Sequence, residues 1–86
     1  QEVSALLFEK GPIRVERIVS NGYASPPGFW YDQAEDELVF VLQGEGVIAF
    51  PDGTEKTLRQ GDSLYLPAGQ KHRVARTSVT PPCLWL

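Results

Sequence analysis

Turn signals divide this chain into short segments, and this division constrains its fold more than any other feature of the sequence. Groups of glycine, proline and aspartate stand at Gly11-Pro12, Gly44-Glu45-Gly46, Pro51-Asp52-Gly53, Gly61-Asp62 and Pro67-Ala68-Gly69. No window between them shows the long i, i+3, i+4, i+7 apolar pattern of an amphipathic helix. Short segments bounded by such turns are typical of antiparallel β-structure, so we expect an all-β protein.

The segments between the turns have the composition of β-strands. They are rich in Val, Ile, Leu, Phe and Tyr, and cover residues 6–8, 13–19, 38–42, 47–50, 54–58, 63–66 and 84–86. The clearest hairpin joins residues 47–50 to 54–58, because Asp52-Gly53 readily supplies positive φ between two strands. The pattern predicts an antiparallel sandwich or barrel.

Length and charge limit the possible functions. Eighty-six residues form one domain, residues 1–86, because a usual domain has about 150 residues. The net charge is −3 and no basic run occurs, so we expect no nucleic-acid partner. No apolar run reaches the length of a membrane span, and no signal peptide follows Gln1, so we expect a cytoplasmic protein that binds no membrane. The single cysteine, Cys83, cannot form an internal disulfide, and we expect it to act as a small apolar residue.

The single histidine, His72, lies in a distinctive context. Gly61, Pro67, Gly69 and His72 follow the pattern G-x5-P-x-G-x2-H-x3-N, with Arg76 in place of the final asparagine. This segment resembles the second motif of the cupin family. The resemblance implies a small antiparallel β-barrel or jelly roll of the cupin type, commonly dimeric, with a site in the mouth of the barrel.

The first cupin motif, G-x5-H-x-H-x3-4-E-x6-G, is matched in part. Glu37 and Gly44 have its spacing, whereas Gly28 fits the frame only loosely. Counting back from Glu37 with the three-residue spacer places Tyr31 and Gln33 where the family has two histidines. The four-residue spacer would place Trp30 and Asp32 there instead.

The resemblance also implies a metal site, of which this chain keeps a part. In the family, two histidines, a glutamate and a third histidine hold one metal ion. The corresponding candidate ligands here are Gln33, Glu37 and His72, for one divalent ion (Mn, Mg, Ni, Zn or Fe). A single imidazole is short of the nitrogen donors that favour zinc, so a hard ion that keeps several waters suits the set better.

Strand alternation favours an internal site. Side chains alternate between the two faces of a strand, so Glu37 and Val39 share one face, as do His72 and Val74. The predicted small-molecule site therefore consists of Tyr31, Gln33, Glu37, Val39 and His72. A carboxylate opposite a histidine could also act as an acid–base pair without a metal, or could simply be a buried pair of polar groups.

Three hypotheses about function stay open at this point. The first is a cupin barrel that binds a small molecule without turnover. The second is a metal-dependent cupin enzyme, such as a dioxygenase, isomerase or decarboxylase, that acts on a small polar organic compound. The third is a structural module with a filled barrel whose function lies at a homodimer surface.

Other charged and aromatic residues are interpreted structurally. We expect Arg14, Glu16 and Arg17 on the solvent side of an edge strand, where charges oppose aggregation. We expect Arg73 to form an ion pair on the exterior. We expect Glu35 and Asp36 to lie in a solvated loop. We expect the aromatic residues Phe29 and Trp30 to lie in the core or in a dimer interface.

Overall fold

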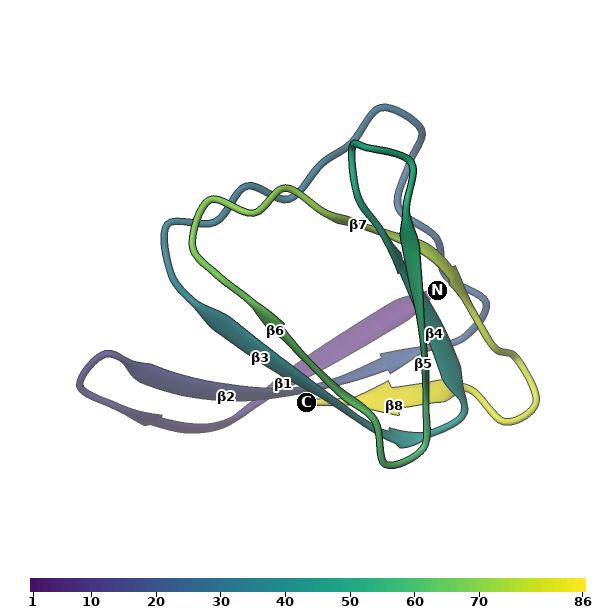
Figure 1. The fold of residues 1–86 in the computed structure, drawn as a ribbon. Helices are drawn as coiled ribbons and strands as arrows, with labels where there is room; N and C mark the ends of the chain where they lie inside the picture. Colours follow the sequence, from purple (N-terminus) through teal and green to yellow (C-terminus); the bar gives the residue numbers. More distant parts are fainter.

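The computed structural model describes residues 1–86 as eight β-strands joined by turns and loops, without a helix. The strands are β1 (Glu2–Lys10), β2 (Ile13–Ser20), β3 (Glu37–Gln43), β4 (Glu45–Ala49), β5 (Glu55–Arg59), β6 (Ser63–Leu66), β7 (Arg73–Thr77) and β8 (Cys83–Trp85). They form a five-stranded sheet of order β1-β2-β8-β3-β6 and a three-stranded sheet of order β5-β4-β7, and every strand pair is antiparallel (Figure 1). The predicted all-β, antiparallel jelly-roll class is confirmed.

The strand predictions succeed where turn residues mark both ends of a strand. β6 has the predicted bounds, and the β4–β5 hairpin forms as expected, with Gly53 at φ +91°. β1 is longer than the predicted residues 6–8, because Glu2, Ser4, Glu9 and Lys10 interrupt its apolar pattern while its backbone still pairs with β2. β7 is not among the predicted apolar runs, since its sequence Arg-Val-Ala-Arg-Thr contains no run of large apolar residues.

The core lies between the two sheets. It consists of Val39, Val41, Ile48, Leu58, Leu66, Val74, Cys83 and Trp85. Cys83 is fully buried, as expected for an apolar role, and burial raises the pKa of its thiol to about 11. The thiol is therefore protonated at neutral pH and is a poor nucleophile.

Two glycines allow the chain to pass from the five-stranded sheet to the three-stranded sheet. Gly44 joins β3 to β4 at φ +77°, and a Cβ there would lie 2.6 Å from the backbone oxygen of Pro82. At Gly46 a Cβ would lie 2.8 Å from the ring of Trp85. The predicted Gly44-Glu45-Gly46 turn is thus a crossing between sheets, and no larger residue fits at its two glycine positions.

The position of β2 corrects one prediction. We expected the strand containing Arg14, Glu16 and Arg17 to be an edge strand, but β2 lies between β1 and β8. The reason is that β8, which pairs with the second edge of β2, is far from β2 in the sequence. The true edge strands of this sheet are β1 and β6.

The hairpin of β1 and β2 extends past the rest of the molecule, at the left of Figure 1. Its apolar side chains Leu6, Leu7, Phe8 and Ile13 are each more than half exposed. Nothing else in the chain covers them. The structure contains no helix with the length and apolar character that a membrane span needs.

Candidate functional site

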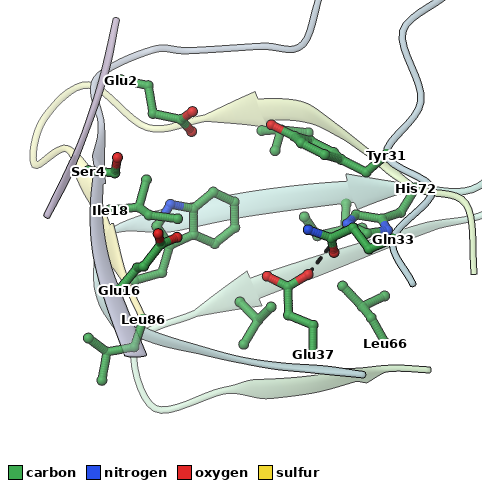
Figure 2. A pocket seen from close by; sticks show the side chains of 14 residues that line it. Glu2, Ser4, Glu16, Ile18, Tyr31, Gln33, Glu37, Leu66, His72 and Leu86 are labelled. Atoms are coloured by element: carbon green, nitrogen blue, oxygen red, sulfur yellow. Dashed lines mark ion pairs between the residues drawn. The ribbon is translucent and has the colours of Figure 1, made fainter. Parts of the chain in front are cut away.

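A cavity of about 220 Å³ lies between the two sheets, and strands of both sheets contribute to its wall (Figure 2). Its lining consists of Glu2, Ser4, Glu16, Ile18, Tyr31, Gln33, Glu37, Val39, Ile48, Leu66, His72, Val74, Trp85 and Leu86. All five residues of the predicted small-molecule site are in this lining. The barrel is therefore not filled by its own side chains.

Two loop residues are held at the cavity by a short backbone ladder. Tyr31 N–H donates to the oxygen of His72 at 2.7 Å, and His72 N–H donates to the oxygen of Tyr31 at 3.1 Å. The two rings stack with their centroids 5.2 Å apart and their planes at 23°. The segment before β3 and the segment before β7 are thereby joined, and both rings are fixed at the cavity.

A second set of hydrogen bonds holds the loop that carries Gln33. Gly69 N–H donates to the backbone oxygen of Gln33, and Ala68 N–H donates to Asp36 Oδ1, both at 2.8 Å. Asp36 thus fastens its loop to the turn that precedes His72, which is more than the solvated role we expected. The Pro67-Ala68-Gly69 turn of the second motif therefore also positions the first motif.

His72 is buried, with 6% of its surface exposed. Its Nδ1 lies 3.0 Å from the backbone oxygen of Gln70. A carbonyl oxygen only accepts hydrogen bonds, so Nδ1 must carry the hydrogen. Nε2 is left as the atom that faces the cavity, either with a free lone pair or as a second donor.

The Glu37 carboxylate lies opposite this nitrogen. Its Oε1 is 3.8 Å from His72 Nε2, and Oε1 is buried without a hydrogen-bond partner (Figure 2). Burial raises the pKa of Glu37; the neighbouring His72 partly opposes this shift, and Glu16 adds to it. A buried acceptor without a donor is costly, so this atom favours a visiting group that can donate a hydrogen bond to it.

Tyr31 contributes a neutral hydroxyl to the cavity. Burial, together with the charge of Glu2, raises its pKa to about 12. The phenol is therefore protonated at neutral pH. It can donate or accept a hydrogen bond, but it does not offer a phenolate to a metal ion.

Two acidic residues of the cavity escaped the sequence analysis. Glu16 was expected on a solvent face, but it shares the inner face of β2 with Ile18, and both line the cavity. Glu2 lines it from β1. Glu16 and Ile18 are two residues apart, so strand alternation puts both side chains on the same face of β2. This spacing would have predicted an inward-facing Glu16 if β2 had been known to form part of the cavity wall.

Arg73 also differs from its predicted role. Its side chain does not form the expected exterior ion pair; instead, Nη2 donates to the backbone oxygen of Ser25 at 2.6 Å. Ser25 Oγ in turn accepts a hydrogen bond from Val74 N–H at 3.0 Å. Arg73 therefore anchors the proline-rich loop to β7. The aromatic residues of that loop, Phe29 and Trp30, are exposed rather than in the core.

The residues present do not fit the metal centre that the cupin resemblance implies. No three or more His, Cys, Asp or Glu side chains group closely enough to hold a metal ion. His72 and Glu37 supply two donors, and Gln33 adds at most a neutral amide oxygen. A tightly held zinc ion has three or four protein ligands, so this set could support only an ion held mainly by water. The three-residue metal site stays a prediction.

Comparisons with known proteins relate the chain to one family. Residues 17–86 match the sequence profile of the family described as "Cupin domain". A crystal structure of a candidate mannose-6-phosphate isomerase from Ralstonia eutropha JMP134 is 43% identical, with a TM-score of 0.93, covering 99% of this chain and 80% of that one. A cupin superfamily protein from Desulfitobacterium hafniense DCB-2 is 25% identical, with a TM-score of 0.75 and coverages of 99% and 74%.

A third structure is less similar in sequence, so it supports the fold alone. It is a cupin-2 domain containing protein from Shewanella frigidimarina NCIMB 400, 23% identical, with a TM-score of 0.75, and the match covers 96% of this chain and 74% of that one. The chain has no significant match among curated proteins.

Proposed function

Because the chain belongs to the cupin domain family, we propose that its cavity binds a small polar organic molecule at Tyr31, Gln33, Glu37, Val39 and His72. One observation carries the proposal. Glu37 Oε1 is buried without a hydrogen-bond partner inside a cavity large enough for a small molecule. A bound hydroxyl or amine would satisfy this atom, which otherwise costs free energy in the folded state.

The unique histidine gives a direct test. A panel of sugars, polyols, amino acids and hydroxy acids is titrated against the protein while the His72 ring resonances are followed by NMR. At least one compound class should shift them, and Glu37→Gln should weaken its binding about tenfold, the value of one hydrogen bond to a charged group.

The matched control is Glu55→Gln, because Glu55 is an exposed carboxylate on β5, outside the cavity. It should leave the affinity unchanged. A panel in which no compound shifts the His72 resonances, or equal affinities for wild type and Glu37→Gln, would overturn the proposal.

A cupin enzyme is the second candidate, and the relative described as a candidate mannose-6-phosphate isomerase supports it. Glu37 and His72 face each other and could exchange a proton with a bound compound. Elemental analysis of protein purified without an affinity tag separates the candidates. Stoichiometric metal that is lost in both His72→Ala and Glu37→Ala would favour the metal-dependent enzyme; its absence would favour binding.

The homodimer expected from the sequence is also a proposal, and we place it at the β1–β2 hairpin. The occupant is a second copy of the chain. β1 is an edge strand with an unpaired backbone edge, and the apolar side chains Leu6, Leu7 and Phe8 are exposed along the same strand. A twofold axis beside β1 would pair the two edges and cover both apolar surfaces at once.

A further inference from the structure

The charges in the cavity wall are of one sign. Glu2, Glu16 and Glu37 reach the cavity from β1, β2 and β3, and Figure 2 shows their carboxylates at separate places around it. No lysine or arginine is in the lining. Glu16 Oε2 lies 3.7 Å from Arg14 Nε, but both side chains are about half exposed, so solvent screens this pair.

Glu2, an exposed residue at the start of β1, is tied to the core by a chain of two hydrogen bonds. Trp85 Nε1–H donates to Ser20 Oγ at 3.1 Å, and the Ser20 hydroxyl donates to Glu2 Oε2 at 3.0 Å. Ser20 is fully buried. Ser20 thus tethers one carboxylate oxygen of Glu2 beside the cavity, which lowers the ordering cost of using this side chain as an acceptor.

On the side of the cavity opposite Glu2, two polar atoms have no hydrogen-bond partner. The His72 side chain is 7% exposed, and its Nε2 makes no hydrogen bond; its nearest charged neighbour is Glu37 at 3.8 Å. Glu37 Oε1 has no donor. The His72 ring already faces a carboxylate, so it is not a free partner for an anionic ligand. The cavity thus offers carboxylate acceptors on two sides.

Building on the proposed binding function, we propose that the ligand is a small hydroxylated amine, bound as its ammonium ion between Glu2 and Glu37, and that the cavity excludes phosphorylated sugars. An ammonium group brings up to three donors to these acceptors. A phosphate would meet like charges without a cation to offset them. The ligand class would therefore differ from the one named for the Ralstonia relative.

Three probes that share one hexose skeleton test this assignment: mannosamine, mannose and mannose 6-phosphate. Each is titrated near neutral pH, because the pKa of Glu37 is raised and an acidic solution would neutralise one of the two carboxylates. The dissociation constant is taken from the His72 ring resonances. Mannosamine should bind about tenfold more tightly than mannose, the value of one charge-assisted hydrogen bond, and mannose 6-phosphate should bind least tightly.

The variant Glu2→Gln keeps the shape of the side chain and removes its charge. It should remove most of the advantage of mannosamine over mannose, while Glu55→Gln should preserve it. Binding of mannose 6-phosphate as tight as that of mannosamine would overturn the ligand class but leave the binding function standing. Equal effects of Glu2→Gln on mannosamine and mannose would do the same. No resonance shift with any of the three probes would overturn both.

Discussion

The two ends of the β1–β2 hairpin behave differently, although they belong to the same two strands. Near Glu2 and Ser20 the hairpin is part of the cavity wall, and a buried tryptophan and serine hold its side chains. Near Phe8 and Ile13 it extends past the other strands with its apolar side chains exposed. The pairing of β1 with β2 is therefore not enough to bury a strand: at the first end β2 also pairs with β8, through residues 18–20, and at the second end no third strand joins the hairpin.

The largest effect is expected for glycine substitutions that compare the hairpin tip with the packed crossing between β3 and β4. Gly44→Ala should cost more than about 3 kcal/mol, because its Cβ would overlap backbone and the residue has positive φ. Gly11→Ala at the hairpin tip should cost only about 1 kcal/mol, because φ is +56° but nothing lies within 4 Å of the added Cβ. Urea unfolding of both variants measures the difference; equal losses would contradict the contrast.

The exposed end of the hairpin should control self-association. Phe8→Asp would place a charge in the proposed dimer contact, and the dimer dissociation constant should rise at least about a hundredfold, from lost apolar burial and repulsion across the twofold axis. Sedimentation equilibrium measures it. Glu9→Gln on the same strand should leave the dimer intact. A wild-type protein that is monomeric over the whole concentration range would refute the placement.

At the cavity end, the buried serine should matter for stability. Ser20→Ala leaves Trp85 Nε1 without its acceptor and should cost about 2 kcal/mol in thermal or urea unfolding. Ser4, also in the lining, makes no side-chain hydrogen bond, so Ser4→Ala should change stability by no more than about 0.5 kcal/mol. If the two variants lost equal stability, the hydrogen-bond chain would not hold this end together.

The smallest expected effect is a pH dependence at Glu37. Its pKa is raised in the folded protein, so the folded state binds this proton more tightly than the unfolded state does. The contribution of Glu37 to stability is therefore greatest below the unfolded pKa of 4.5 and falls as the pH rises toward the raised folded value.

The variant Glu37→Gln should remove this loss. At neutral pH it should be more stable than wild type by less than about 1 kcal/mol, because the side chain is partly exposed and solvent screens the effect. Unfolding is measured across the acidic to neutral range, with Glu9→Gln at the hairpin end as the control. A Glu37→Gln variant that is less stable than wild type at neutral pH would contradict the assigned cause.

The sequence predicted best the parts of the fold that local chemistry specifies. Gly61-Asp62 and Pro67 bound β6 on both sides, and Asp52-Gly53 requires a hairpin, so these elements follow from turn chemistry. The motif spacing also located Glu37 and His72, which the structure brings to within 3.8 Å of each other. The hairpin and β6 depend on short-range turn patterns, whereas Glu37 and His72 were selected because the chain resembles the cupin family.

The missed features depend on contacts between distant parts of the chain. Glu16 lines the cavity because pairing with β8 makes β2 part of the cavity wall, and no residue near Glu16 in the sequence identifies that partner strand. Glu2 is fixed by Ser20 and Trp85, which come from two other strands. The acidic character of the cavity, on which the ligand class depends, therefore appeared only with the three-dimensional structure.

The order of strands in the five-stranded sheet has a further consequence for the newly made chain. Its central strand is β8, which follows every other strand in the sequence, so the ribosome releases the flanking strands before their common partner exists. The sheet cannot close during synthesis until Trp85 has emerged. Until then, the β1–β2 hairpin and β3 present open edges and uncovered apolar side chains, and this nascent form is the one that chaperones would have to shield from aggregation.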